Sequence, residues 1–220
     1  MTQSNTAIAR HNMVSQQIRT WNVLDHKVLK VFAGSPREDY VPEAFKNCAY
    51  SDTAIPMGNG EYVLTPQMEG KMLQALDIKA TDTILEIGTG SGHLTSLLAQ
   101  LGKHVYSVEL DADLAAAAEA RLKAHDITNV TIEQGDGARG WDSHQPYDVI
   151  VLTGSLPVLP ESFKETLTKG GRLFAVIGDA PVMEARLVTR INDEHWGSLV
   201  LFETSLPPLK NAIPSRQFQF

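Results

Sequence analysis

A glycine-rich stretch is the part of this sequence best suited to hold a ligand. Gly88, Gly90 and Gly92 follow the short apolar run 83–87, which has the residue types of a buried strand. Glycine permits a tight turn and a close approach of the backbone to a ligand, and the start of the following helix supplies unpaired N–H groups. The stretch therefore predicts a strand-to-helix turn with a binding site at its edge.

Two acidic positions further along the chain strengthen this prediction. Glu109 ends the second predicted strand, where a carboxylate can accept hydrogen bonds from both hydroxyls of a ribose. Asp136 stands between Gly135 and Gly137 after the third predicted strand, where its side chain and a neighbouring N–H can meet the edge of an adenine. These elements at the ends of three strands favour a nucleoside-containing cofactor over a glycine turn without a ligand.

The spacing of the glycines discriminates between two such cofactors. Dinucleotide-binding folds prefer G-x-G-x-x-G, because a pyrophosphate must sit on the helix N-terminus. Here the spacing is G-x-G-x-G, and Glu86 lies two residues before the first glycine. A carboxylate at this point repels a pyrophosphate and attracts the ammonium or sulfonium of S-adenosylmethionine. The pattern therefore favours a methyltransferase.

The composition excludes several other classes of protein. The chain has 220 residues, 43% of them hydrophobic, and a formal net charge of -7. It is long enough for one domain with a sizeable core, and no stretch approaches the ~18 consecutive apolar residues that a membrane-spanning helix requires. An acidic chain without a basic stripe repels nucleic acid and anionic lipid. Because the N-terminus also lacks the pattern of a secretory signal, we expect a cytoplasmic protein that binds neither nucleic acid nor a membrane.

The cysteine and the histidines add no catalytic or metal site to this interpretation. Cys48 is the only cysteine, so it forms no internal disulfide, and we expect it to be a small buried residue. The seven histidines have no metal-ligand spacing, so no metal is expected. His93 directly follows the glycine stretch, and it either faces the cofactor or packs inside the protein.

Two sequence patterns meet near residue 80. Residues 1–80 carry apolar positions at helical spacing, which predict helices over 8–18 and 23–32 and a third that begins after Pro66 and ends near Asp77. Residues 81–220 alternate between strands and helices, which predicts a parallel sheet with helices on both faces. Strands are predicted at 83–87, 105–108, 130–132, 148–152 and 172–177, and the segments 188–191 and 199–202 can add an antiparallel pair at one edge.

Several motifs resemble those of protein-L-isoaspartate O-methyltransferases, and the resemblance runs over most of the chain. The segment 34–38 and the combination of residues 135–137 with Trp141 are specific to that family, whereas the glycine stretch is common to many methyltransferases. The other matching segments are 13–19, 36–42, 49–52, 55–60, 86–92, 146–148 and 170–173.

The resemblance implies the α/β fold of class I S-adenosylmethionine-dependent methyltransferases, a Rossmann-like seven-stranded sheet with an N-terminal helical cap. Residues 1–80 would then form the cap and the substrate loop, and residues 81–220 the cofactor-binding domain, the two making one compact unit. The implied reaction is protein repair, in which a methyl group passes from S-adenosyl-L-methionine to the carboxylate of isoaspartyl residues in damaged proteins and leaves S-adenosyl-L-homocysteine. We expect a monomer or a homodimer.

The substrate loop departs from the family pattern. Leu64 stands where the family has a serine, Glu61 where it has a glutamine and Tyr62 where it has a threonine. Thr65 could supply a hydroxyl from the next position only if the loop shifts. The negative charge added by Glu61 disfavours a carboxylate substrate. Near the C-terminus, Lys210 replaces a threonine of the family.

Three functions remain open because of these departures. They are isoaspartyl repair, methyl transfer by the same fold to a different acceptor, and cofactor binding without methyl transfer. Residues 153–155 replace an alanine-rich run of the family, and we expect them to flank the acceptor pocket together with residues 62–66. The C-terminal Phe218-Gln219-Phe220 carries two aromatic side chains that could dock on the domain or on a partner.

The candidate site residues fall into three groups. Leu64 and Thr65 are the candidate catalytic residues. The candidate cofactor-binding residues are Glu86, Gly88, Thr89, Gly90, Ser91, Gly92, Glu109, Leu110, Asp136, Gly137 and Thr153. The candidate substrate-binding residues are Tyr62, Val63, Pro66, Gly154 and Ser155.

Overall fold

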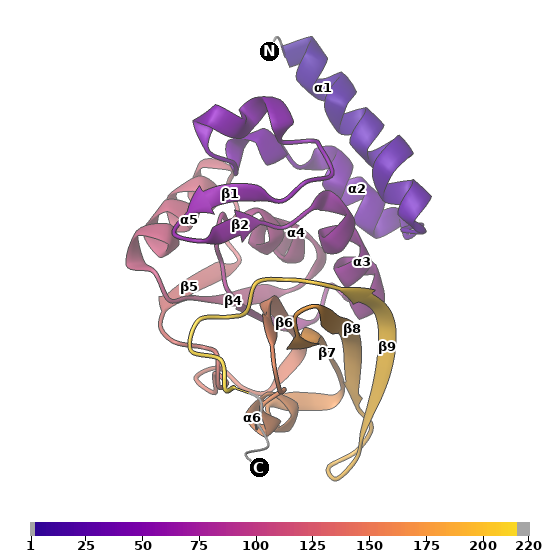
Figure 1. Cartoon of the computed structure of the whole chain (residues 1–220), viewed down its shortest axis with the longest axis vertical. Coiled ribbons are helices and arrows are strands. Elements are labelled where there is room, and N and C mark those ends of the chain that lie inside the picture. The colour runs from indigo at the N-terminus through magenta and orange to yellow at the C-terminus, as the bar shows by residue number, and fades with distance from the viewer. Residues whose placement is uncertain (1–2, 215–220) are drawn as a thin grey trace.

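The computed structural model describes residues 3–214, and a mixed seven-stranded sheet lies at its centre (Figure 1). The strand order is β5-β4-β3-β6-β7-β8-β9. Neighbouring strands from β5 to β7 are parallel, whereas β8 is antiparallel to both β7 and β9. The strands are β3 (Thr83–Ile87), β4 (His104–Glu109), β5 (Val130–Gln134), β6 (Tyr147–Leu156), β7 (Leu167–Asp179), β8 (Val182–Arg190) and β9 (Trp196–Thr204). The parallel sheet with an antiparallel addition at one edge is confirmed, although β8 begins earlier than the sequence predicted.

The strands of this sheet are apolar because both faces of its centre are covered. Side chains that alternate along a strand point to opposite faces. Accordingly, Ile84 and Val149 belong to one buried hydrophobic cluster, and the adjacent Leu85 and Ile150 belong to a second cluster. Burial on both faces explains why these strands form continuous apolar runs rather than alternating patterns.

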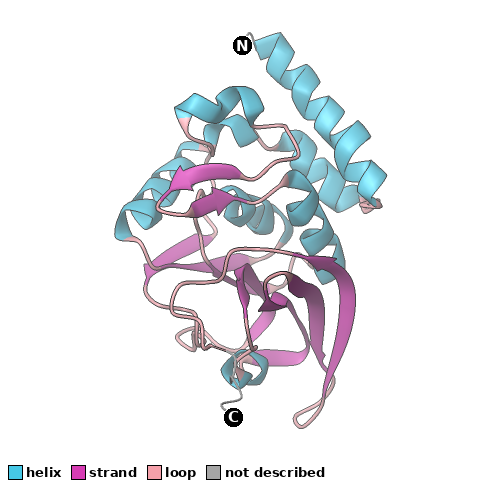
Figure 2. Cartoon of the chain, viewed as in Figure 1, coloured by secondary structure: helices cyan, strands magenta, loops and turns pink. Residues whose placement is uncertain are grey.

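Helices cover both faces of the sheet, most of them on the side that carries the N-terminal region, and α6 lies at the opposite end of the molecule (Figure 2). Side-chain caps fix where two of them begin. The Thr65 hydroxyl accepts from the N–H of Met68 at the start of α3, and the Asp111 carboxylate accepts from the N–H groups of Asp113 and Leu114 at the start of α5. The helices from α3 onward are α3 (Pro66–Leu76), α4 (His93–Leu101), α5 (Ala112–Ala124) and α6 (Glu161–Glu165).

The N-terminal region packs onto the same core as the sheet. Met13, Ile18 and Phe32 are fully buried and belong to one hydrophobic cluster with Ile84 and Phe174. The helical elements of this region are α1 (Gln3–Asn12), η1 (Met13–Ile18), η2 (Arg19–Trp21), α2 (His26–Gly34), η3 (Arg37–Asp39) and η4 (Glu43–Cys48). No helix within residues 3–214 is long and apolar enough to cross a membrane.

Two parts of the chain differ from what the sequence predicted, the substrate loop and the position of Cys48. The substrate loop contains a short antiparallel hairpin, β1 (Ile55–Gly58) and β2 (Glu61–Val63), where the sequence predicted no strands because Pro56 and two glycines interrupt it. The expectation that Cys48 is buried is wrong: it is exposed at the end of η4, and the residues after it, Ala49 and Tyr50, fill the core instead. The segment Phe218-Gln219-Phe220 lies outside the described residues.

Candidate active site

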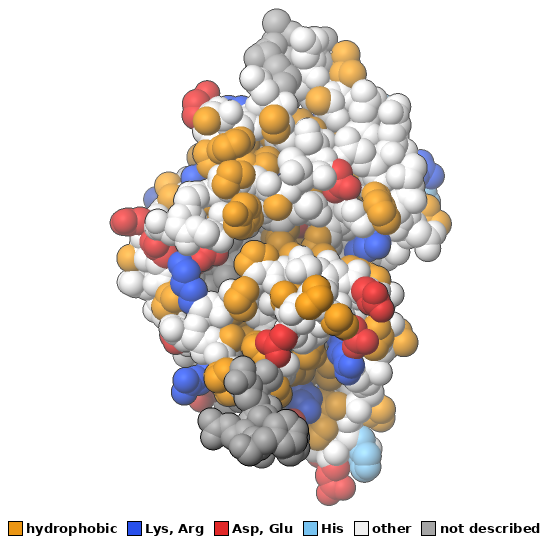
Figure 3. All heavy atoms as spheres, viewed as in Figure 1, with side chains coloured by type: hydrophobic (Ala, Val, Ile, Leu, Met, Phe, Trp, Pro, Cys, Tyr) orange, Lys and Arg blue, Asp and Glu red, His pale blue; other side chains and the backbone are white. Residues whose placement is uncertain are grey.

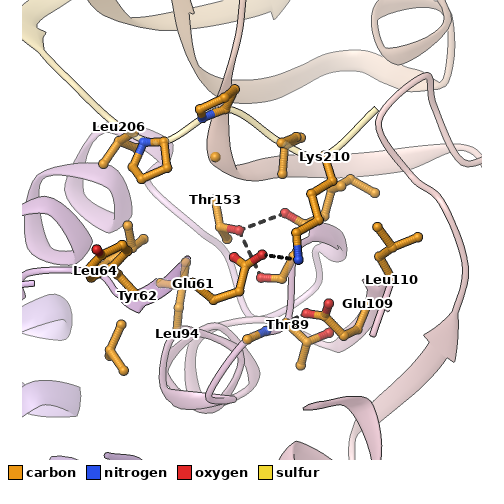
Figure 4. Close-up of a pocket in the computed structure, with 18 of the residues that line it drawn as sticks. Glu61, Tyr62, Leu64, Thr89, Leu94, Glu109, Leu110, Thr153, Leu206 and Lys210 are labelled. Atoms are coloured by element: carbon orange, nitrogen blue, oxygen red, sulfur yellow. Dashed lines mark hydrogen bonds and ion pairs between the residues drawn. The ribbon is translucent and has the colours of Figure 1, made fainter. Parts of the chain in front are cut away.

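The candidate site is a cavity of about 500 Å³ at the carboxyl ends of β3, β4 and β6 (Figure 4). Its volume lies in the usual range for small-molecule sites. The β1–β2 hairpin bounds it on one side and the segment that follows β9 on the other. On the face drawn in Figure 3, hydrophobic side chains gather at the level of this hairpin and along the facing segment. In an open α/β sheet, the carboxyl ends of the strands are the usual place for a ligand.

The glycine turn forms the floor of this cavity. Gly88 has a φ of +95°, and a Cβ atom at this position would overlap the hydroxyl of Thr153. That hydroxyl lies 2.9 Å from the carbonyl oxygens of Ile87 and of Gly88 and donates to them, which ties β6 to the turn. Only glycine therefore satisfies both the backbone conformation and the space at position 88.

Glu109 is held in one orientation beside the turn. Its two carboxylate oxygens accept from the N–H groups of Gly90, at 2.8 Å, and of Asp111, at 3.1 Å. Each oxygen of a carboxylate has two lone pairs, so both oxygens can still accept from a ligand. The glutamate is buried and lines the cavity, as its predicted role at a ribose requires.

Asp136 lies on the same side of the cavity and is also anchored. One of its oxygens accepts from the N–H of Ala138 and the other from the side chain of Asn211, at 3.0 Å. Gly137 lies against Ile87, whose Cδ1 would be 2.7 Å from an added Cβ atom. These contacts hold the loop after β5 close to the glycine turn.

Glu86 has a different position from the other predicted cofactor residues. It is fully buried behind the turn and is not among the residues that line the cavity. One oxygen accepts from Thr95 at 2.5 Å and from Ser107 at 2.7 Å, while the other oxygen has no hydrogen-bond partner among the described residues. Burial raises the pKa of Glu86 to about 8, against the opposing effect of the two hydroxyls.

The acceptor side of the cavity is built from the β1–β2 hairpin and the start of α3. The predicted residues Tyr62, Val63, Leu64 and Thr65 line it, but the Thr65 hydroxyl is already used as the cap of α3, 3.2 Å from the N–H of Met68. Gly154 lines the cavity as well. The predicted residues that do not line it are Pro66, Glu86, Gly92 and Ser155.

A buried ionic network binds the main chain of Leu64. Arg37 donates to the backbone carbonyl of Leu64 and, at 2.6 Å, to the carboxylate of Glu69. Burial by itself raises the pKa of Glu69, but the charges and hydrogen bonds of Arg37 and His93 together outweigh it and keep the pKa below its usual value. The acceptor loop is therefore fixed through its main chain, whichever side chain stands at position 64.

His93 belongs to this network and packs inside the protein. Burial lowers the pKa of His93, so the ring is neutral. Its Nδ1–H donates to Glu69 at 2.9 Å, and its Nε2 accepts from the hydroxyl of Ser35 at 3.2 Å. Of the two alternatives that the sequence left open, the structure favours a packed ring, since His93 does not line the cavity.

The segment after β9 contributes lining residues that no sequence pattern pointed to. Ser155, at the end of β6, donates its N–H to Pro207 and accepts from the N–H of Leu209, both at 2.9 Å. These bonds hold the segment across the carboxyl edge of the sheet, so that residues 204–210 form one wall of the cavity. The segment has neither helical nor strand periodicity, which is why no local pattern indicated this role.

The cavity fits S-adenosylmethionine better than a dinucleotide. Among the described residues that line it, the acidic ones are Glu61, Glu69, Glu109 and Asp136, and the one cation is Lys210. An acidic lining favours a cofactor that carries an ammonium and a sulfonium and disfavours a pyrophosphate. The oriented Glu109 and the space that Gly88 leaves free agree with a nucleoside bound against the turn.

The raised pKa of Glu86 predicts a dependence of stability on pH. The folded chain keeps this proton up to about pH 8, whereas the unfolded chain releases it near 4.5. The free energy of unfolding of the wild type should therefore fall, relative to Glu86→Gln, as the pH rises between these values. The slope is at most about 1.4 kcal/mol per pH unit. Urea unfolding of both proteins across this range measures the difference, and a difference independent of pH would contradict the buried, protonated state.

Comparison with known proteins identifies the family. The family model for protein-L-isoaspartate(D-aspartate) O-methyltransferase matches residues 9–206. The protein-L-isoaspartate O-methyltransferase of Pectobacterium carotovorum is 38% identical over 185 residues, which cover 84% of this chain and 86% of the relative. Protein-L-isoaspartate O-methyltransferase 1 of Geotalea uraniireducens is 35% identical over 209 residues, which cover 94% and 95%.

Solved structures show the same fold. A protein-L-isoaspartate O-methyltransferase superposes with a TM-score of 0.82 at 23% identity, covering 93% of this chain and 67% of the solved one. A Plasmodium falciparum structure in complex with S-adenosyl-L-homocysteine gives a TM-score of 0.79 at 20% identity, covering 93% and 98%. The class I methyltransferase fold predicted from the sequence is confirmed. Since the family model and the curated relatives both cover most of its length, this chain belongs to the protein-L-isoaspartate(D-aspartate) O-methyltransferase family.

Proposed function

We propose that this chain transfers the methyl group of S-adenosylmethionine to the α-carboxylate of L-isoaspartyl residues in damaged proteins. The observation that carries the proposal is the position of the β1–β2 hairpin. The β1–β2 hairpin lies over the same cavity that the glycine turn and Glu109 form, so one space holds both a nucleoside cofactor and its acceptor (Figure 4). Membership of the family supports the same activity.

We propose that the parts of the cofactor bind on the two sides of the turn. Glu109 would accept the ribose hydroxyls, and Asp136 with Gly137 would meet the adenine. Gly88 and Gly90 would let the main chain approach the methionine part, because neither carries a side chain into the cavity. Glu86 would support the turn from behind, through its hydrogen bonds with Thr95 and Ser107, because it is protonated at neutral pH and does not line the cavity.

The reaction requires little acid–base chemistry from the protein. When bound, the cofactor supplies an electrophilic methyl group on a sulfonium, which departs as the neutral thioether S-adenosyl-L-homocysteine. The acceptor carboxylate, with a pKa of ~4, is already an anion at neutral pH, so no general base is needed. The task left to the chain is to align the two groups and to exclude water. Val63, Leu64 and Leu206 provide apolar walls for this purpose.

Some further expectations belong to the same proposal. We propose that residues 1–80 act as a cap and substrate loop over the cofactor-binding part 81–220. The substrates would be proteins or peptides that contain isoaspartyl residues. The chain would work in the cytoplasm as a monomer or a homodimer and would bind neither nucleic acid nor a membrane, in keeping with its net charge of -7.

Cofactor binding should depend on the absence of a side chain at position 88. In Gly88→Ala the added Cβ atom would clash with the hydroxyl of Thr153. This variant should therefore lose binding of S-adenosylmethionine in a calorimetric titration. The matched control is Gly170→Ala, where φ is also positive, at +80°, but no atom lies within 4 Å of the added Cβ. Both variants carry the backbone strain, so equal loss of binding in both would contradict the assigned role of the turn.

The acceptor can be tested with labelled S-adenosylmethionine and a pair of peptides, one isoaspartyl and one aspartyl. We expect base-labile methyl ester on the isoaspartyl peptide alone. Leu64→Ser should raise kcat/KM about three- to tenfold, because one added hydrogen bond to the acceptor contributes about 0.5–1.5 kcal/mol. The Arg37 bond to the main chain at position 64 should keep the loop in place in this variant.

Other outcomes of this assay would select the alternatives. Cofactor binding without transfer to either peptide by the wild type would indicate a different acceptor or a protein that no longer transfers methyl groups. Restoration of activity in Leu64→Ser would then locate the divergence at that side chain. Equal transfer to both peptides would refute recognition of the isoaspartyl linkage.

A further inference from the structure

An ion pair joins two distant parts of the chain across the mouth of the cavity. Glu61 begins β2, and Lys210 lies in the segment after β9. The Lys210 ammonium is 2.7 Å from the Glu61 carboxylate, and the two side chains point toward each other in Figure 4. Both residues depart from the family pattern at their positions, and the structure places these departures in direct contact.

The pair is accessible to an incoming ligand. The side chain of Lys210 is 48% exposed and that of Glu61 is 37% exposed. Ion pairs with this exposure contribute little to stability, so either partner can be exchanged at small cost. The raised pKa of Lys210 has the hydrogen bond to Glu61 as its main cause, with smaller contributions from the nearby Asp111 and Glu109.

The other acidic groups of the lining are already engaged by the protein. Glu69 is paired with Arg37, the Glu109 carboxylate accepts two backbone N–H groups, and Asp136 is held by Ala138 and Asn211. These carboxylates line the cavity that an anionic acceptor has to approach, and none of them can attract it. Among the lining residues within the described part of the chain, it meets one positive charge, that of Lys210.

We propose that Lys210 attracts the acceptor carboxylate at the cavity mouth, and that Glu61 is its resting partner and competes with the acceptor for it. The inference rests on the proposed function, since it requires a carboxylate acceptor. It also resolves the conflict between a carboxylate substrate and the charge of Glu61. The Lys210 ammonium neutralises the charge of Glu61 in the resting state, and it becomes available when the acceptor carboxylate displaces Glu61.

Two single substitutions separate this role from a structural one. Lys210→Gln should raise KM for the isoaspartyl peptide about fivefold and leave kcat within about twofold, because the lost attraction acts at a partly exposed site before the chemical step. Glu61→Gln should instead lower KM, by about threefold, because it removes the competitor. A pair that merely fastens the hairpin to the C-terminal segment would give changes of the same sign in both variants.

Dependence on salt gives a second readout. The wild-type KM should rise with ionic strength, since screening weakens the attraction, and this rise should be much smaller in Lys210→Gln. Lys164→Gln is the control: it removes a partly exposed lysine that is 2.7 Å from Glu161 on α6, away from the cavity, and should leave KM and its salt dependence unchanged. Thermal unfolding should be the same in all four proteins, since exposed ion pairs contribute little to stability.

The outcomes separate this proposal from the proposed function. A wild type that binds the cofactor but does not methylate the isoaspartyl peptide would refute the proposed function, and the proposal with it. Normal wild-type turnover with an unchanged KM in Lys210→Gln would refute the role of Lys210 alone. Parallel changes of KM in Lys210→Gln and Glu61→Gln would assign the pair a purely structural role.

Discussion

The sharp turn between β3 and α4 is the constraint on which the candidate site depends. Gly88 has a positive φ and no room for a side chain, because the hydroxyl of Thr153 occupies the space beside it and binds the carbonyls of the turn. The next glycine, Gly90, donates its N–H to Glu109. One backbone conformation therefore sets the floor of the cavity, ties β6 to β3 and orients the carboxylate predicted for the ribose.

The acceptor side is held by a separate set of contacts. The buried Arg37 binds the main chain at Leu64 and the carboxylate of Glu69, which in turn accepts from His93 at the start of α4. Because α4 begins directly after the glycine turn, this network links the acceptor loop to the cofactor floor. A reaction that depends on alignment rather than on acid–base groups requires such a link.

The charge of the cavity lining affects the cofactor and the acceptor in opposite ways. Its acidic lining favours a cationic cofactor, but the same lining opposes an anionic acceptor. We infer that the pairing of Glu61 with Lys210 reconciles the two requirements, since it would place a positive charge at the mouth for the acceptor and leave the acidic floor unchanged. The substitutions at positions 61 and 210 thus have a joint explanation.

The sequence predicted the parts of the structure that local patterns determine. Apolar runs predicted the five parallel strands, and the glycine spacing with Glu109 and Asp136 predicted the floor of the cavity, because these residues follow directly from strand ends. The β1–β2 hairpin was missed because proline and glycine interrupt two very short strands. The wall formed by residues 204–210 and the pairing of Glu61 with Lys210 depend on contacts between distant segments, which no local pattern contains.

We expect S-adenosylmethionine and its product to bind in this cavity with the ribose on Glu109. The most direct test is a calorimetric titration of the wild type and of Glu109→Ala with S-adenosyl-L-homocysteine. We expect one site per wild-type chain and an affinity at least about tenfold lower in the variant, since hydrogen bonds to a charged group contribute about 1.5–3 kcal/mol. Absence of binding to the wild type, or an unchanged affinity in Glu109→Ala, would contradict this expectation.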